Sequence, residues 1–370
     1  MHKLYYILPA ASAIYLVYRF PSEYWWAYLL TALVMELLLY LGIKRAGKSP
    51  EYLSGYAVSV EHHEAWTERV IITETYTDGK GNTKTRTRVT YVYHPDKWLI
   101  AFNTARVEEI NKGLYREIIS TWDASPIPIF PLHINCVSGG GGQRYDWDSL
   151  REHAFTSTYK GLYTNYIINS NSIFKSGVVT NETARELGLV DYPSFNGMES
   201  EAVLKSPLLD ISITSEWERD IRLFNAFHGL ANQIHVFVIL FPANAGLQSA
   251  LKQREFWRGG NKNEFTICLG IAKDLKVEWC KAFSWCDIPK METALESWYL
   301  EHRELDFVKL SNWLEENVSA LWKRKEFKDF KYLGKKLSPA RSALVGFLTL
   351  AACALFIYVV YYIFAQGQLQ

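Results

Sequence analysis

Three long apolar runs constrain the fold of this chain more than any other feature of its sequence. The first extends from Leu4 to Phe20 and the second from Trp25 to Ile43, with only the tight turn Pro21-Ser22-Glu23 between them. The third extends from Ala343 to Phe364. A helix that crosses about 30 Å of hydrocarbon needs about 20 apolar residues, so the second and third runs are long enough and the first is marginal. The sequence therefore predicts an integral membrane protein with an N-terminal helical hairpin and one C-terminal helix.

Residues around the first two runs indicate how they would meet a bilayer. Trp25 and Trp26 lie where the second helix would enter, as expected of an interfacial aromatic belt. A secretory signal is the alternative for the first run, because Lys3 precedes an apolar region with small residues at positions 10–13. Those small residues lie inside the apolar run, and a second apolar run follows almost at once. The helical hairpin is therefore the favoured interpretation.

Basic residues beside the apolar runs predict the orientation of the chain. Lys44, Arg45 and Lys48 flank the second run, whereas the turn at Pro21 and the tail after Ala365 carry almost no positive charge. The positive-inside rule then predicts a multi-pass protein of an inner or cell membrane with its soluble domain in the cytoplasm. The five cysteines form no disulfide framework, which agrees with a reducing compartment.

A basic segment precedes the third run. It would rest against anionic headgroups, or it acts only as a topology signal. Its members are Lys323, Arg324, Lys325, Lys328, Lys331, Lys335 and Lys336.

Glu36 interrupts the second apolar run. An ionisable side chain at such a position is costly in a membrane and is a functional candidate by default. The favoured interpretation is structural, because in an antiparallel hairpin Glu36 falls opposite the start of the first helix, within reach of His2, Lys3 or Tyr5. A role in ion conduction or in assembly is the alternative.

The soluble region between the second and third runs is long enough for one large or two ordinary domains. Its chain is a folded one, because 49% of the sequence is hydrophobic and only 21% is charged. We predict an α+β or α/β domain with a β-rich subdomain at 50–125 and a mixed α/β subdomain at 126–325, between membrane segments at 1–46 and 342–364. The formal net charge of +1 provides no strong nucleic-acid signal.

A β-hairpin is the most specific local prediction in this region. Segments 67–77 and 83–93 are rich in Thr, Val, Ile and Tyr, and two glycines in the loop between them supply the positive φ of a short turn. The loop pairs Thr77 with Thr83. The pairs that follow are Tyr76 with Lys84, Glu74 with Arg86, Ile72 with Arg88, and Ile71 with Val89.

The predicted hairpin has one charged face and one apolar face. The charged face contains the row Lys84, Arg86 and Arg88. A solvent-facing edge protected by charge is favoured for this row over a grip on phosphates or lipid headgroups.

Periodicity predicts further elements along the soluble region. Val107, Ile110, Leu114 and Ile118 indicate an amphipathic helix at 105–122 that packs on the first strands. The Gly-rich segment 138–142 is interpreted as a flexible loop, since a phosphate cradle needs a Lys-Ser or Lys-Thr at its end. The patterns further on predict strands at 234–241, 264–271 and 277–283 and helices at 245–256, 289–303 and 307–322.

The densest polar cluster between two of these elements is the candidate ligand site. Its two glycines allow close approach of a ligand, and its side chains offer donors to an anion or a nucleotide. A helix C-cap with Gly259 in the left-handed conformation is the favoured alternative. The candidate ligand residues are Arg258, Asn261, Lys262, Asn263 and Glu264.

Other reactive side chains give weaker signals. Glu61-His62-His63-Glu64 is competent for metal, but neighbours on a strand point to opposite faces, so no metal is assigned. Cys136 with His133 or His153 is a candidate nucleophile pair, although packing explains a cysteine near a histidine as well. The sequence names no reaction and no cofactor.

These observations predict a membrane-anchored cytoplasmic binding or assembly module. Its expected partners are the lipid bilayer and either further copies of the chain or another membrane protein. The alternative is a membrane-anchored hydrolase or nucleotide-responsive effector that uses the loop at 258–264.

Overall fold

A computed structural model gives the fold, and it describes residues 5–21, 25–46, 48–77, 79, 81–131, 135–164, 179–193, 198, 201–257, 259–285, 290–325 and 339–366. The protein is a mixed α+β chain with several antiparallel sheets. It divides into two compact units, which are described separately. The first comprises 1–51, 160–180 and 325–370, and the second comprises 52–159 and 181–324.

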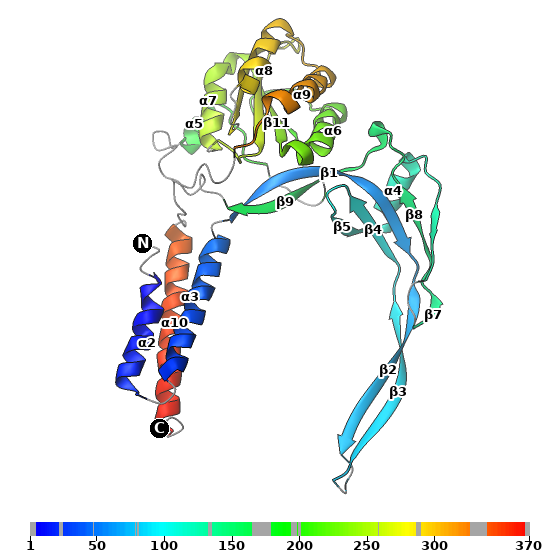
Figure 1. The fold of residues 1–370 in the computed structure, drawn as a ribbon. Helices are drawn as coiled ribbons and strands as arrows, with labels where there is room; N and C mark the ends of the chain where they lie inside the picture. The colour runs from blue at the N-terminus through cyan, green and yellow to red at the C-terminus, as the bar shows by residue number, and fades with distance from the viewer. Residues whose placement is uncertain are drawn as a thin grey trace. The chain divides into compact units, whose positions relative to one another are not determined.

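Three apolar helices make up the described core of the first unit (Figure 1). Two of them, by length and composition, can cross a membrane over Trp25–Lys44 and Ser342–Ala365. The remaining helix has 13 residues, which span about 20 Å at about 1.5 Å per residue, less than a hydrocarbon core. The helices are α2 (Ile7–Arg19), α3 (Trp25–Ala46) and α10 (Pro339–Ala365).

Small and aromatic side chains hold these helices together. Ala13 and Leu16 of α2 are fully buried, and Phe20 packs against Tyr361 and Phe364 of α10 with ring centroids 6.1 and 5.1 Å apart. At the other end of the bundle, the Tyr5 hydroxyl donates to the Ser342 carbonyl over 3.1 Å.

The second unit begins with a six-stranded sheet in the order β5-β4-β1-β8-β6, with β9 also paired to β1. Its apolar face is covered by α4, whose Tyr115 and Ile118 are buried against Val60 and Ile100. The elements are β1 (Lys48–His63), β4 (Lys97–Phe102), β5 (Val107–Ile110), α4 (Lys112–Thr121), β6 (Ile127–Ile129), β8 (Gly142–Asp146), the 3₁₀ turn η1 (Arg151–His153) and β9 (Thr156–Thr164).

The predicted helix at 105–122 is wrong in its first part. Residues Val107–Ile110 form strand β5, which pairs with β4 after a turn in which Ala105 has a φ of 60°. The Asn111 side chain accepts a hydrogen bond from the Leu114 N–H over 2.9 Å, and this cap starts the helix at Lys112. Helix α4 covers the six-stranded sheet.

The hairpin prediction is confirmed, register included. Strands β2 (Trp66–Thr77) and β3 (Thr83–His94) pair antiparallel, with Thr77 opposite Thr83 and Ile71 opposite Val89. Strand β7 (Cys136–Gly139) pairs with the base of β2 and completes a three-stranded sheet in the order β3-β2-β7. The segment at 138–142, interpreted as a flexible loop, instead enters strands β7 and β8 at its two ends.

A four-stranded sheet with helices on it forms the remainder of the second unit. Its order is β10-β11-β12-β13, parallel except for the antiparallel pair β12 and β13. All eight residues of β12 are buried, as expected of a strand covered on both faces. The strands are β10 (Val203–Lys205), β11 (His235–Pro242), β12 (Glu264–Ile271) and β13 (Val277–Ser284).

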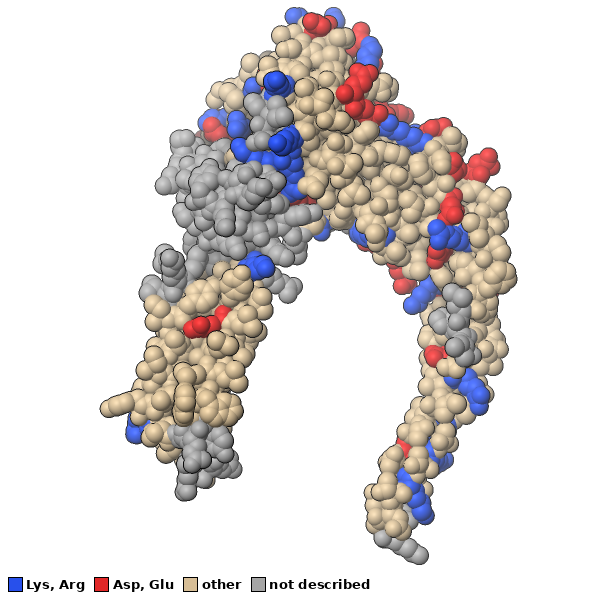
Figure 2. All heavy atoms as spheres, viewed as in Figure 1, with Lys and Arg blue, Asp and Glu red and all other residues tan. Residues whose placement is uncertain are grey.

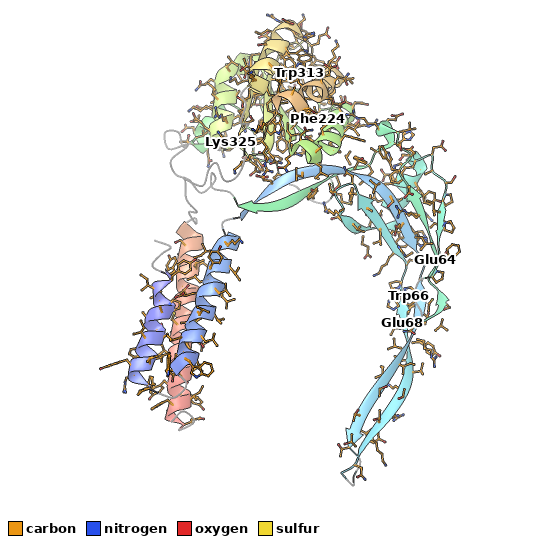
Figure 3. All side chains as sticks on the ribbon, viewed as in Figure 1. Glu64, Trp66, Glu68, Phe224, Trp313 and Lys325 are labelled. Atoms are coloured by element: carbon orange, nitrogen blue, oxygen red, sulfur yellow. The ribbon has the colours of Figure 1, made fainter. Side chains whose placement is uncertain are left out.

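Helices pack on both faces of this sheet. Phe224, Leu295 and Leu314 come from three different helices and are buried in one core with Val238 and Ile267. Figure 3 labels Phe224. On the opposite face, Trp257 packs edge to face against Phe237 at 5.8 Å. The helices and the remaining 3₁₀ turn are α5 (Asn181–Glu186), α6 (Ser215–Asn232), η2 (Ala243–Ala245), α7 (Gly246–Phe256), α8 (Lys290–Glu301) and α9 (Phe307–Leu321).

Candidate functional site

The described residues of the candidate ligand loop are buried. Asn261 is 5% exposed, Glu264 is 1% exposed, and both Lys262 and Asn263 are fully covered. The remaining member, Arg258, lies outside the described residues. The loop therefore presents its described side chains to the interior of the second unit.

Hydrogen bonds join three of these buried side chains, those of Asn261, Asn263 and Glu264, to neighbouring groups. The Glu264 carboxylate accepts from the Asn261 backbone and side-chain nitrogens, both over 2.7 Å, and from the Tyr192 hydroxyl. The Asn261 amide also donates to the Tyr192 hydroxyl over 2.8 Å, and Asn263 donates to the Tyr52 carbonyl over 2.6 Å. Burial, reinforced by the negative charge of Glu264, raises the pKa of Tyr192 well above its usual value. The network ties together β1, β12 and the segment around Tyr192.

The glycines of the loop end helix α7. Gly259 and Gly260 have φ values of 78° and 70°, and the Gly259 N–H donates to the Arg254 carbonyl over 2.7 Å. This is the left-handed ending of a helix. A Cβ on Gly259 would also lie 2.8 Å from the Trp285 ring. Both the positive φ and the close aromatic ring therefore require glycine at this position. Ligand binding by this loop stays a prediction.

The hairpin exposes side chains along most of its length. On its apolar face, Ile71 is 57% exposed, Tyr91 is 63% exposed and Tyr93 is 67% exposed. On the opposite face Lys84, Arg86 and Arg88 are all exposed. Figure 2 shows basic side chains recurring along the hairpin. The two faces thus differ in chemistry: one exposes aromatic and aliphatic side chains, and the other carries three basic residues, of which Arg88 lies 3.7 Å from the Glu74 carboxylate.

The base of the hairpin is anchored by aromatic and charged groups. The Trp66 ring stacks on His94 with centroids 4.2 Å apart, and His94 Nε2 lies 3.1 Å from the Glu68 carboxylate. Figure 3 marks Trp66 and Glu68 at this base. At this base, β7 pairs with Trp66, Thr67 and Glu68, and the Arg69 N–H donates to the Asn135 carbonyl over 2.9 Å. From Val70 to the tip, the hairpin is a two-stranded ribbon.

His153, which the sequence indicated only as a partner for Cys136, pairs with Asp148 in the segment that follows β8. His153 Nδ1 lies 2.5 Å from Asp148 Oδ2. Burial alone would raise the pKa of Asp148, but hydrogen bonds from His153 and from the Leu150 and Asp123 N–H groups outweigh it and lower that pKa. His153 lines a cavity of about 170 Å³. Thr121 also lines this cavity, and its hydroxyl donates to the Ile118 carbonyl. A carboxylate at Nδ1 fixes the orientation of the His153 ring and favours the tautomer whose Nε2 can accept a proton.

The other candidate reactive groups are separated by the structure. The Cys136 thiol donates to the Gly139 carbonyl over 3.4 Å, and its proposed partner His153 pairs with Asp148. His62 pairs with Asp96 and His63 with Glu61. Across the described part of the chain, no three metal-ligating side chains form a group. His133 lies outside that part.

The membrane-side candidates are described only in part. Glu36 is half-buried on α3. Lys323 and Arg324 end the second unit, and Lys325 begins the last segment of the first unit. The Arg324 guanidinium donates to the Gln233 side chain. The remaining basic residues lie outside the described residues, namely Lys328, Lys331, Lys335 and Lys336.

Comparison of the chain with known protein families, curated proteins and solved structures finds no match. The function is therefore inferred from the geometry of the described residues.

Proposed function

We propose that this chain is a membrane-anchored binding or assembly module whose binding arm is the β2–β3 hairpin. Helices α3 and α10 are the proposed membrane anchor with α2 as the first arm of its hairpin, and the soluble region is proposed to lie in the cytoplasm. The single observation that carries the proposal is the exposed two-stranded ribbon. Such a ribbon is at best marginally stable alone in water, and this one exposes aromatic and aliphatic side chains as well.

The outer edge of β3 favours a second copy of the chain as the partner. An edge strand presents unpaired N–H and C=O groups that can pair with another strand. Two-fold antiparallel pairing of β3 about Val89 places Arg88 opposite Thr90, Arg86 opposite Val92 and Lys84 opposite His94. No two like-charged side chains face each other in this register, and the apolar faces of both hairpins join.

The network around Glu264 supports this function over the effector alternative. Its carboxylate, amide and phenol groups satisfy one another inside the second unit. A ligand at the loop would have to displace those bonds, whereas the hairpin needs no rearrangement to meet a partner.

One observation favours the alternative of a membrane-anchored hydrolase, namely the His153–Asp148 pair beside a cavity. Hydrolysis through His153 requires a water or substrate hydroxyl in that cavity. His153→Gln would then abolish hydrolysis of a substrate, while an assembly module would keep its oligomeric state in this variant.

The test of the proposed function removes the ribbon without disturbing its base. Ile71 and Val89 face each other in the same type of antiparallel pair as Thr77 and Thr83, so residues 72–88 can be replaced by an Asn-Gly turn that closes the hairpin there. Chemical cross-linking of this variant in membranes is expected to give no oligomer. The variant is expected to stay in the membrane during alkaline extraction. The matched control replaces only residues 78–82 by Asn-Gly between Thr77 and Thr83 and keeps the oligomer. Equal cross-linking of both variants would contradict the proposal.

A further inference from the structure

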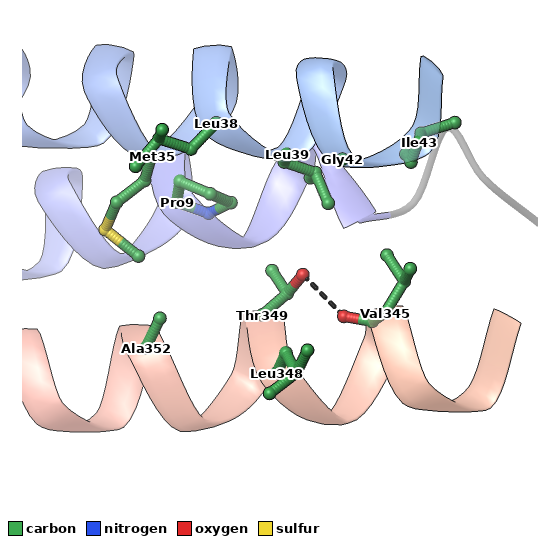
Figure 4. Close-up of a pocket in the computed structure, with 10 residues that line it drawn as sticks. All are labelled: Pro9, Met35, Leu38, Leu39, Gly42, Ile43, Val345, Leu348, Thr349 and Ala352. Carbon is green, nitrogen blue, oxygen red and sulfur yellow. Dashed lines mark hydrogen bonds between the residues drawn. The ribbon is translucent and has the colours of Figure 1, made fainter. Parts of the chain in front are cut away.

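The three apolar helices enclose a groove along the first unit (Figure 4). It has a volume of about 240 Å³. The groove is lined by Pro9 of α2, by Met35, Leu38, Leu39, Gly42 and Ile43 of α3, and by Val345, Leu348, Thr349 and Ala352 of α10. This volume is that of roughly eight methylene-sized groups, at about 30 Å³ for a group the size of a water molecule.

The lining of the groove suits a hydrocarbon chain. Leu38 and Leu348 form exposed walls, and Pro9, Ile43 and Thr349 are buried at the floor. The Thr349 hydroxyl donates to the Val345 carbonyl over 2.8 Å, so it places no unsatisfied polar group in the groove (Figure 4).

Small side chains keep the groove open. A Cβ built on Gly42 meets no atom within 4 Å, and Ala352 contributes only a methyl group from α10. The two small residues lie on different helices. Thr349 and Ala352 also lie about one turn apart on α10, as a docking helix from another copy would require, so the small side chains alone do not decide the occupant. The charge at one end of the groove decides it.

Charge at one end of the groove identifies the class of lipid. Lys44 follows Ile43 directly and is exposed. The sequence places Arg45 next and puts Arg341 four positions before Val345, so basic residues gather at this end of α3 and α10. Basic groups between helices at the cytoplasmic surface bind anionic headgroups.

We propose that this groove is a binding site for one acyl chain of an anionic phospholipid, with its phosphate at Lys44. The inference rests on the membrane insertion stated in the proposed function. Surrounding lipid tails are as apolar as the groove, so burial of apolar surface does not favour this lipid over others. Packing against the floor and the phosphate contact make the site selective.

The test counts lipids on the purified full chain by native mass spectrometry, with dioleoyl phosphatidylglycerol or dioleoyl phosphatidylcholine as the probe. The unchanged chain is expected to retain one more lipid molecule when phosphatidylglycerol is the probe than when phosphatidylcholine is. Ala352→Leu and Gly42→Leu fill the groove and lose that lipid. The matched control Ala351→Leu adds the same side chain at an exposed neighbouring position outside the groove and keeps it.

The headgroup contact has its own pair of variants. Lys44→Gln is expected to weaken retention of phosphatidylglycerol about fivefold, the factor expected for one basic residue at an anionic surface, and to leave phosphatidylcholine unchanged. Arg19→Gln, in the last turn of α2, is the control and is expected to change the retention of neither lipid.

Three results would overturn the inference. Equal retention by Ala352→Leu and Ala351→Leu would remove the groove as the site. A changed dimer fraction with unchanged lipid retention in the groove variants would identify a second copy as the occupant. Equal retention of both lipids by the unchanged chain would remove selectivity. If alkaline carbonate releases the unchanged chain from membranes, the proposed function itself fails, and the two failures are thereby distinguished.

Discussion

The hydroxyl of Tyr192 donates to the carboxylate of Glu264, a residue 72 positions further along the chain. This bond joins a segment of irregular structure to the start of β12 in the interior of the second unit. Because the same carboxylate accepts from Asn261, one buried acid fixes the end of α7, the start of β12 and the segment around Tyr192.

Removal of the Tyr192 hydroxyl is expected to destabilise the second unit. Tyr192→Phe keeps the ring but withdraws a donor from a buried carboxylate, at a cost of about 1.5–3 kcal/mol in the free energy of unfolding. Tyr76→Phe, at an exposed position in the hairpin, serves as the control and is expected to change it by less than about 0.5 kcal/mol. Denaturant titration of the full chain in detergent measures both. Equal denaturation midpoints for Tyr192→Phe and the unchanged chain would show that the bond contributes nothing to stability.

Gly259→Ala tests the helix ending at the same loop. The substitution places a Cβ at a positive φ and within 2.8 Å of the Trp285 ring. We expect a loss of about 1–3 kcal/mol in stability. Gly79→Ala, where a Cβ meets no atom within 4 Å, provides the matched control and is expected to be close to neutral. Full stability of Gly259→Ala, in the same titration, would contradict the described loop.

A buried histidine makes stability depend on pH. Complete burial lowers the pKa of His235 to about 3, against an ordinary value near 6.5 in the unfolded chain. The unfolded state therefore binds the proton first, and the stability due to neutral His235 is present above about pH 6.5 and falls as pH decreases toward 3. The expected loss from this group is about 2 kcal/mol between pH 8 and pH 5.

The measurement is the unfolding free energy of the full chain as a function of pH. His235→Gln removes the titrating group, so this variant is expected to lose less stability than the unchanged chain between pH 8 and pH 5. An identical slope for both proteins would assign the acid sensitivity to other groups.

Sequence patterns were sufficient where local chemistry sets the structure. The hairpin register follows from a short glycine loop and alternating side chains, so Thr77 could be paired with Thr83 correctly. Helices α8 and α9 were located by single apolar stripes, because each buries one face.

Elements set by tertiary contacts escaped the same reasoning. Helix α6 has no clean stripe, since Phe224 enters the sheet core while Phe227 stacks on Tyr56 from the six-stranded sheet at 4.4 Å. Strand β5 carries a helical spacing but pairs with β4. The bond between Tyr192 and Glu264 joins residues too distant in sequence for any local pattern to indicate.

The tip of the hairpin tests the proposed topology. Asn82→Cys, in a version without the five native cysteines, places one thiol in the loop. A membrane-impermeant thiol reagent is expected to leave it unlabelled in intact cells and to label it after the cells are opened. Labelling in intact cells would place the soluble region outside the cytoplasm.

We propose that two copies pair along β3, and a single introduced disulfide tests this pairing. In the cysteine-free version, Val89→Cys lies opposite its own copy at about 4.5–5.5 Å between Cα atoms, within the range of a disulfide. Thr85→Cys lies opposite Tyr93, which separates the two introduced cysteines by about 27 Å along the strands. Mild oxidation in membranes is predicted to give a covalent dimer of the Val89→Cys chain and none of the Thr85→Cys chain. Failure of Val89→Cys to cross-link, or equal cross-linking of both chains, would contradict pairing through β3.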